Sequence, residues 1–234
     1  MVINIAPNTF GGPLRNGDMI ALLNALEYIR KENPEAKFHM MSGTINSAKY
    51  CQDMFSFLCD NTDYFSVEPG QHILPWKRVN LWDFRDISGD IAEIKNTKTM
   101  RKKIVVFPLF DAPYNTYRNW PKQVFENILN EYNKPEYAEY EKLICIQNEL
   151  PQTYDGWKYS TDFMTNIYHI MESEIFIGAE TGSAVFASAL DKPPQKLIYY
   201  YSSRGLIHTL PFNVLRGKGE LKTYWGDFEG TSWQ

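Results

Sequence analysis

The 234-residue sequence contains few cysteines, no long apolar segment and no large excess of charge of either sign. Its three cysteines, Cys51, Cys59 and Cys145, form no Cys-x-x-Cys pair, which argues against a disulfide framework or a zinc knuckle and favours reduced thiols. No uncharged stretch approaches the roughly 20 residues that span a membrane. The net charge of -4 gives no broad basic field for nucleic acid. We therefore expect a soluble, cytoplasmic protein, from a bacterium or from the cytoplasm of a viral host.

Several enzyme motifs are also missing. The sequence has no Gly-x-x-x-x-Gly-Lys-Ser/Thr, no Gly-x-Gly-x-x-Gly and no Gly-x-Ser-x-Gly, so nucleoside-triphosphate hydrolysis, dinucleotide binding and a hydrolase nucleophile lack their fingerprints. Its four histidines are widely separated, and none has a Cys or His neighbour at metal-ligand spacing. Asp83 and Asp86 do not form the Asp-x-Asp motif of metal-dependent transferases. We expect neither a metal nor another cofactor.

Short runs of β-branched and aromatic residues alternate with segments whose apolar residues recur at helical spacing. The predicted strands cover residues 2–5, 37–41, 64–67, 104–108, 143–147, 174–177 and 196–200, the last of them taken as the final strand. The predicted helices cover residues 18–30, 46–58, a segment from 121 onward, 162–171 and 182–190. We expect Ser160 or Thr161 to cap the helix 162–171. This alternation predicts an α/β fold with parallel sheets.

A polar stretch, residues 86–103, separates two such series of strands and helices. We interpret its last residues, Arg101-Lys102-Lys103, as a solvated linker in front of the next strand. A lobe boundary placed in this stretch divides the chain into residues 1–95 and residues 96–234.

The predicted strand 175–177 leads into Gly178-Ala179-Glu180-Thr181-Gly182-Ser183 and then into a helix rich in alanine. At such a turn, free backbone N–H groups and the positive end of the helix dipole favour a phosphate. Thr181 and Ser183 add hydroxyl groups, and Gly182 allows a ligand to approach the backbone closely. The alternative is an ordinary turn in which Thr181 is only the N-cap of the helix.

Asp18 follows Asn16 and Gly17 at the start of the first predicted helix. The helix dipole stabilises a carboxylate in this position, so we expect Asp18 to be ionised near neutral pH and able to act as a general base. The alternative is that Asp18 only caps the helix.

Arg118 lies in the loop after the first strand of the second series. Ligands in open α/β sheets bind beyond the carboxyl ends of strands, where an arginine could pair with a phosphate in a bidentate manner. The alternative is a solvated surface arginine. Tyr201 and Arg204 follow the predicted strand 196–200 and are further candidates for lining a ligand cleft.

In this order, these segments resemble the ADP-heptose:lipopolysaccharide heptosyltransferases, glycosyltransferase family 9. In that family a Gly-Asp pair opens the first helix, as Gly17-Asp18 does here. A lysine before a Trp-Pro pair contacts the donor phosphates, where this chain has Arg118 before Asn119-Trp120-Pro121. The family's Gly-x-Asp-Thr-Gly turn looks like residues 178–182, with Glu180 in place of the aspartate.

The resemblance implies a GT-B-like fold of two small Rossmann-like lobes and a metal-independent, inverting glycosyltransferase. Residues 1–95 would form the acceptor-side lobe, with Asp18 as the base that deprotonates an acceptor hydroxyl, on a glycan or a modified nucleic acid. Residues 96–234 would form the lobe that binds the nucleotide-sugar donor. The phosphate-binding residues would be Arg118, Glu180, Thr181, Gly182 and Ser183, and Asn16, Gly17, Tyr201 and Arg204 would line the cleft between the lobes.

Two other interpretations remain open. The first is a phage-type glycosyltransferase that acts on modified DNA bases, which the acidic charge balance opposes, because duplex binding requires several basic residues. The second is a non-catalytic module that binds a nucleotide sugar, in which Asp18 would be only a cap. Salt-sensitive retention on DNA would favour the first, and binding without turnover would favour the second.

Overall fold

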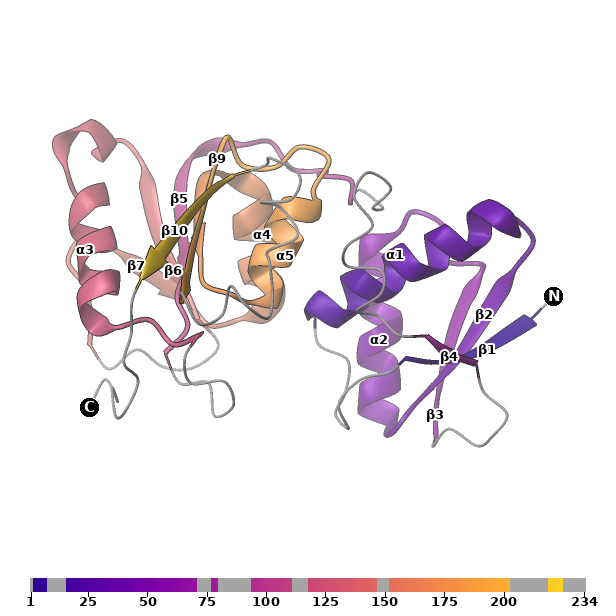
Figure 1. Ribbon diagram of the computed structural model, residues 1–234. Coiled ribbons are helices and arrows are strands. Elements are labelled where there is room, and N and C mark those ends of the chain that lie inside the picture. Colours follow the sequence, from indigo (N-terminus) through magenta and orange to yellow (C-terminus); the bar gives the residue numbers. More distant parts are fainter. Residues whose placement is uncertain are drawn as a thin grey trace. The chain divides into compact units, whose positions relative to one another are not determined.

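The computed structural model describes residues 2–7, 16–70, 77–79, 94–110, 118–146, 152–202 and 219–224. The chain divides into two compact units, Met1–Lys95 and Asn96–Gln234. Each unit contains one sheet of parallel strands with helices beside it (Figure 1). The α/β class with parallel sheets that the sequence predicts is confirmed.

The first unit is built on four parallel strands in the order β3-β2-β1-β4. Its elements along the chain are β1 (Val2–Pro7), α1 (Asn16–Glu32), β2 (Lys37–Ser42), α2 (Ile45–Leu58), β3 (Phe65–Pro69) and β4 (Lys77–Val79). The sequence analysis predicted all of these except β4, which pairs with β1 over three residues.

The helices of the first unit begin where local hydrogen bonding and apolar spacing favour them. Helix α2 follows Thr44, whose hydroxyl accepts a hydrogen bond from the backbone N–H of Ser47 at 3.2 Å. Helix α1 begins at Asn16, ahead of the predicted start, and so holds Asp18 in its first turn. The buried core includes Met19, Ile20, Leu22, Leu23 and Leu26 of α1 and the alternate residues Phe38 and Met40 of β2.

The second unit contains six parallel strands in the order β10-β9-β8-β5-β6-β7. Its strands are β5 (Arg101–Phe107), β6 (Glu141–Cys145), β7 (Lys158–Ser160), β8 (Ser173–Gly178), β9 (Lys196–Ser202) and β10 (Glu220–Tyr224). Its helices are α3 (Lys122–Tyr132), the short 3-10 helix η3 (Pro135–Tyr137), α4 (Phe163–Glu172) and α5 (Gly182–Ala189). Counted along the chain from β5, the strands lie in the order 6-5-4-1-2-3, which is that of doubly wound dinucleotide-binding sheets.

Three details of the second unit differ from the sequence predictions. The strand at 196–200 is not the final one, because β10 adds to the sheet beside it, from Glu220 opposite Ile198 to Tyr224 opposite Ser202. The sequence analysis also missed β7, a three-residue strand at the opposite edge of the sheet. Residues 101–103 are the start of β5 and not a solvated linker, since Lys103 is buried between charged partners described below.

The cap of α4 is also different from the prediction. Asp162 is the N-cap, and its carboxylate accepts a hydrogen bond from the backbone N–H of Thr165 at 2.7 Å. Neither Ser160 nor Thr161 is in this position, because the helix begins at Phe163 and Ser160 belongs to β7. An aspartate is as good a cap as a serine or threonine, so the capping chemistry is as expected and only the residue differs.

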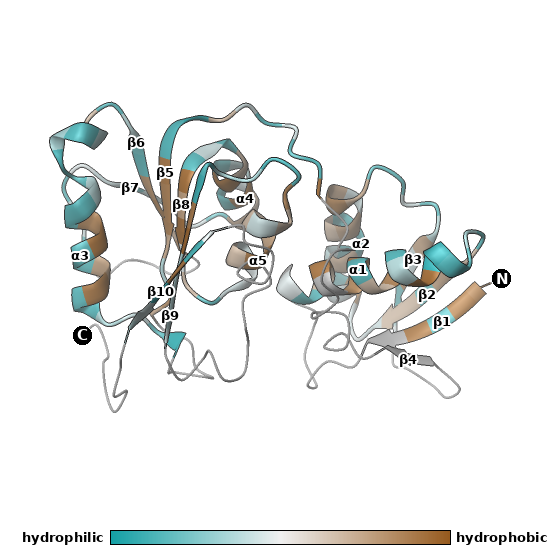
Figure 2. Ribbon diagram, turned by 45° about the horizontal axis from the view of Figure 1, so that its top comes forward, coloured by the Kyte–Doolittle hydropathy of each residue, from teal (hydrophilic) through white to brown (hydrophobic). Residues whose placement is uncertain are grey.

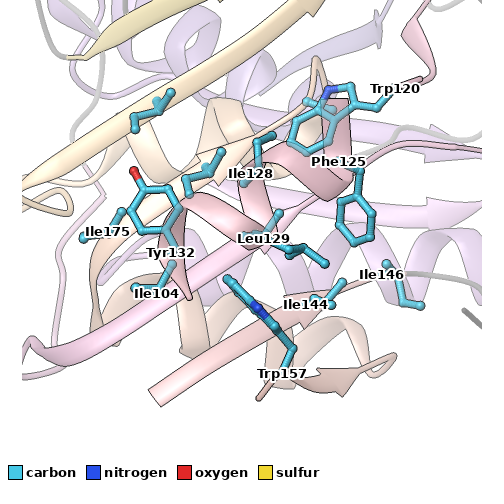
Figure 3. Packing of buried hydrophobic residues seen from close by; sticks show 14 of the residues in the cluster. Ile104, Trp120, Phe125, Ile128, Leu129, Tyr132, Ile144, Ile146, Trp157 and Ile175 are labelled. Atoms are coloured by element: carbon cyan, nitrogen blue, oxygen red, sulfur yellow. The ribbon is translucent and has the colours of Figure 1, made fainter. Parts of the chain in front are cut away.

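Helix α3 closes one side of the second core. Its buried residues Phe125, Ile128, Leu129 and Tyr132 recur at the spacing of one helix face, and Figure 2 shows hydrophobic and hydrophilic residues alternating along α3. They pack against the sheet in one cluster with Ile104, Ile144 and Ile175 (Figure 3). Burying such side chains stabilises the fold by about 1.5–3 kcal/mol each. Trp120, in the same cluster, precedes the helix and is fully buried.

Two consecutive residues at the unit boundary have side-chain partners in different units. Lys95 lies 3.9 Å from the carboxylate of Asp60 in the first unit. Asn96 donates its side-chain N–H groups to the carbonyls of Met171 and Lys192, both at 2.9 Å, within the second. Its backbone N–H donates to Asp191 at 2.7 Å. The second unit is thus closed by hydrogen bonds at its first residue.

Candidate functional site

The strand order of the second sheet reverses between β5 and β8. From β5 the chain continues to β6 and β7 on one side, and then returns to place β8, β9 and β10 on the other. Phe107 of β5 pairs with Gly178 of β8 in parallel register, so the carboxyl ends of the two strands lie side by side. Ligands of open α/β sheets bind beyond the carboxyl edge at such a reversal. The segments that follow β5 and β8 therefore form the candidate site.

The turn after β8 continues into helix α5 through Thr181. The backbone N–H of Ala179 still donates to the carbonyl of Phe107 at 2.9 Å, which fixes the turn beside β5. Thr181 is the N-cap in an extended conformation, and its carbonyl is the first acceptor within the helix. The first N–H group to donate to that carbonyl is the one of Ala184, so the N–H groups of Gly182 and Ser183 have no acceptor within α5. The start of α5 thus offers backbone donors and the positive end of the helix dipole to an anion.

The side chain of Thr181 does not cap α5 in the usual way. Its hydroxyl makes no capping hydrogen bond, and among the described residues its buried Oγ1 has no hydrogen-bond partner. An ordinary N-cap hydroxyl would accept a hydrogen bond from the first turn of its helix. Thr181 is therefore the N-cap by its backbone conformation, as the alternative predicts, but not by a side-chain hydrogen bond.

Arg118, from the segment after β5, lies against the same turn. Its Nε donates to the carbonyl oxygen of Glu180 at 3.0 Å, and its Nη2 donates to the same oxygen. Its Nε also lies 3.8 Å from Oε1 of the Glu180 carboxylate, and the two side chains are only 24% and 10% exposed. Arg118 is therefore not a solvated surface arginine. The Glu180 carbonyl accepts the hydrogen bonds of Nε and Nη2, and none of the described residues accepts a hydrogen bond from Nη1.

The loop that carries Arg118 is held by strands β9 and β10. The hydroxyl of Tyr224 lies 3.1 Å from the carbonyl of Arg118 and 3.2 Å from that of Asn119. The indole N–H of Trp120 donates to the carbonyl of Tyr200 at 3.2 Å. Burial raises the pKa of Tyr224, and the negative charge of Glu180 raises it further while Arg118 opposes the shift, so the hydroxyl keeps its proton.

Sequence reasoning did not identify Tyr224 as part of this arrangement. It ends a five-residue strand of mixed polar and apolar residues, and its partners are about a hundred positions away in the sequence. The alternation of Leu221 and Thr223 with charged and aromatic residues was the available signal for a strand. That signal does not reveal which loop the strand supports.

The other predicted residues of this site have different placements. Ser183 is buried in the first turn of α5. Tyr201 is on β9 and is 2% exposed, and its ring packs edge-on against Tyr199 at 6.3 Å. Arg204 lies outside the described residues. The structure therefore brings together Arg118, Glu180, Thr181, Gly182 and Ser183.

Asp18 has a corresponding position in the first unit. The first sheet has β1 at its centre with β2 and β3 on one side and β4 on the other, so its strand order reverses between β1 and β4. Helix α1 is the first helix after β1, and half-buried Asp18 is in its first turn, next to half-buried Gly17. Burial, Cys51 and the charge of Asp18 together raise the pKa of Tyr50, on α2, to about 12. Asn16 is the first residue of α1.

A second charged cluster lies at the amino end of β5. The ammonium group of Lys103 is 2.6 Å from Glu172, 3.5 Å from Glu141 and 3.2 Å from Nδ1 of His169. Lys103 is 2% exposed, and Arg101 adds a second cation 2.5 Å from Glu172. These side chains come from β5, β6 and α4. We call them the amino-end cluster.

The charges of this cluster shift the pKa values of its members. Burial acts to raise the pKa of Glu172, but hydrogen bonds from Lys103 and Arg101 outweigh it and hold that pKa below the ordinary value. Glu141 behaves in the same way, with Lys103 and Lys158 outweighing burial. Burial lowers the pKa of His169, and the charge of Lys103 lowers it further. Near neutral pH the two carboxylates of the cluster are therefore ionised and the imidazole of His169 is neutral, and Lys158 lies at the edge of the cluster.

The fold is similar to that of a solved glycosyltransferase. The heptosyltransferase WaaC of E. coli, solved with ADP, matches with a TM-score of 0.52 and 11% sequence identity, over 95% of this chain and 91% of that chain. No family model matches the sequence. No curated protein matches it either. At this identity the likeness shows the fold, which is α/β and of the GT-B type.

Among the described residues, no helix is both long and apolar enough to cross a membrane. The same part of the chain contains no group of three or more His, Cys, Asp or Glu side chains arranged to hold a metal ion.

Proposed function

We propose that the protein is a glycosyltransferase that moves a sugar from a nucleotide-sugar donor to an acceptor hydroxyl, with inversion and without a metal. One observation carries the proposal: Arg118 meets the start of α5 where the strand order of a GT-B-type sheet reverses. The resemblance of Gly17-Asp18, Arg118 and residues 178–182 to heptosyltransferase motifs supports it from the sequence.

The nucleotide-sugar donor binds through its phosphates to the second unit. The N–H groups of Gly182 and Ser183 and the hydroxyl of Thr181 donate to phosphate oxygens, as does Nη1 of Arg118. Charge-assisted hydrogen bonds of this kind are roughly twice as strong as neutral ones. The contact of Arg118 with the Glu180 carbonyl keeps the guanidinium beside the turn, so its orientation is set before a phosphate arrives.

The first unit supplies the base. Asp18 takes the proton from the acceptor hydroxyl as the oxygen attacks the anomeric carbon of the sugar. The bond from that carbon to the phosphate oxygen breaks in the same step, so one displacement inverts the configuration. Negative charge then builds on the leaving phosphate, where Arg118 and the start of α5 stabilise it. This assignment requires no metal to neutralise the leaving group.

The test is Asp18→Asn in the full chain, assayed for release of nucleoside diphosphate from a panel of nucleotide sugars with hydroxyl acceptors. We expect the variant to lose transfer, by at least about 100-fold, because general base catalysis contributes on that scale. The variant should still bind the nucleotide sugar, which a thermal-shift assay measures.

Asp53→Asn is the matched control, since Asp53 is an exposed carboxylate of the same unit that pairs with Lys49 on α2. It should leave transfer unchanged. Full activity of Asp18→Asn would show that Asp18 is not the general base. Binding of a nucleotide sugar by the unchanged protein without any turnover would instead identify a binding module.

A further inference from the structure

We propose that Glu180 is a specificity-determining residue, which makes the phosphate site of the second unit favour the sugar-bearing nucleotide over the free nucleoside diphosphate. This inference rests on the proposed function, because it takes Arg118 and the start of α5 to be the phosphate site. It concerns the residue at which this chain differs from the Gly-x-Asp-Thr-Gly pattern that its turn resembles.

Glu180 places a negative charge inside a site that otherwise attracts anions. Its carboxylate is 10% exposed and lies 3.8 Å from Nε of Arg118, in the residue just before the N-cap of α5. The carboxylate therefore offsets part of the positive charge that Arg118 brings to this turn. Because both side chains are largely buried, solvent ions screen this charge less than they would at the surface.

The two ligands of the proposed reaction differ in charge. The terminal phosphate of a free nucleoside diphosphate is a monoester whose second pKa is about 6, so near neutral pH it carries one more negative charge than the same phosphate joined to a sugar. A nearby carboxylate repels that additional charge. With a separation of about 8 Å, an effective dielectric constant of about 20 and partial screening, the repulsion reduces affinity on the order of tenfold. The product of transfer is the ligand that Glu180 disfavours.

The hydrogen bonds of Arg118 make this idea testable with one substitution. Both of them go to the main-chain carbonyl of residue 180 and not to its carboxylate. Glu180→Gln therefore removes the charge while leaving the acceptor that positions Arg118. Glu180→Asp keeps the charge on a shorter side chain.

The experiment measures dissociation constants of the full chain for ADP, UDP, GDP and dTDP and for their glucose conjugates, near pH 7.5. In Glu180→Gln we expect the affinity for the diphosphate, relative to its glucose conjugate, to rise about tenfold. Glu180→Asp should keep the ratio of the unchanged protein. Glu139→Gln removes an exposed carboxylate that pairs with Lys102, at the other end of the sheet, and should also leave the ratio unchanged. The rise in Glu180→Gln should shrink in about 1 M salt, where the Debye length is only about 3 Å.

A second measurement needs no variant. Lowering the pH from about 7.5 to about 5.5 protonates the terminal phosphate, so the unchanged protein should lose much of its preference for the glucose conjugate. An equal ratio in the unchanged protein and Glu180→Gln, or a preference that does not respond to pH, overturns this inference and leaves the proposed function standing. Absence of binding by any of these nucleotides contradicts the proposed function itself, and with it the role of Glu180.

Discussion

The charged side chains at the two ends of strand β5 have different kinds of partners. At the amino end, Lys103 and Arg101 meet Glu172 and Glu141 directly, side chain to side chain. At the carboxyl end, Arg118 donates to a main-chain carbonyl, and the first two backbone N–H groups of helix α5 have no acceptor inside the helix. In the amino-end cluster the cations and carboxylates thus pair with one another. At the carboxyl end, some hydrogen-bond donors have no acceptor among the described residues.

We therefore expect substitutions at the amino end of β5 to affect mainly the stability of the fold, and substitutions at the carboxyl end to affect mainly ligand binding. Removing one member of a self-satisfied buried cluster leaves its partners uncompensated, so the cost falls on folding. Removing a hydrogen-bond donor at the carboxyl end should change the free energy of unfolding little and should lower the affinity for the proposed ligand strongly. Each of the following changes tests that separation.

The largest effect is expected from Glu172→Gln. It leaves the buried ammonium group of Lys103 with Glu141, at 3.5 Å, as its one anionic partner among the residues that the structure describes, and should lower the free energy of unfolding by about 3 kcal/mol. Lys103→Met replaces the buried cation by an apolar side chain of similar length and should cost less. Urea unfolding of both variants measures the difference. A larger loss in Lys103→Met would mean that the cluster is not held together as described.

The next effect is expected at the carboxyl end. Arg118→Ala should weaken binding of the nucleotide sugar about 30-fold, because a hydrogen bond to a charged group contributes about 1.5–3 kcal/mol. Arg118→Lys should recover part of the affinity. Arg101→Ala, at the amino end, is the matched control and should leave affinity unchanged. Equal losses of affinity in the two alanine variants would show that the ends of β5 do not differ as proposed.

Tyr224→Phe should have a smaller effect on the same affinity. It removes only the hydroxyl near the carbonyls of Arg118 and Asn119. We therefore expect the binding free energy to weaken by about 1 kcal/mol, which raises the dissociation constant several-fold. The loss should be absent when Arg118 is already alanine, since Tyr224 acts through the position of that residue. A double-mutant cycle by calorimetry tests this. Additive losses would assign Tyr224 some other role.

The smallest effect concerns pH and belongs to the amino-end cluster. The pKa of folded His169 lies below its ordinary 6.5, so the unfolded chain binds the proton more readily and stability falls as pH drops from 6.5 toward the folded value. The lowered pKa values of Glu172 and Glu141 add a second loss, which begins below their ordinary 4.5. His169→Gln should flatten the dependence of Tm on pH just below pH 6.5 and leave the acid loss in place. An unchanged slope in that range would mean that His169 does not contribute.

Local pattern was enough for many elements of the fold. The apolar spacing of residues 46–58 and 182–190 predicted helices that are found at Ile45–Leu58 and Gly182–Ala189. The two strands that add an edge to the second sheet, β7 and β10, were missed because each has only three to five residues and carries polar side chains. Such strands form because a neighbouring strand offers unpaired backbone groups, which the local sequence does not encode.

The candidate site and the amino-end cluster depend on long-range pairing. Arg118 and Glu180 are 62 positions apart, and Lys103 and Glu172 are 69 apart. Sequence reasoning brought Arg118 and residues 180–183 to one site because both follow strands of the same parallel sheet. It could not show that Arg118 contacts a carbonyl, nor that Lys103 is buried, because a lysine at the start of a strand is ordinarily exposed.

The contacts of Lys95 and Asn96 have a practical consequence for recombination. On one side of this peptide bond the exposed side chain of Lys95 lies near Asp60 of the first unit, and on the other side three hydrogen bonds of Asn96 remain within the second. A junction placed between the two residues would cut none of these contacts. Under the proposed function, libraries that join foreign amino-terminal units at residue 96 would exchange the unit that carries Asp18 and keep the phosphate site of the second unit.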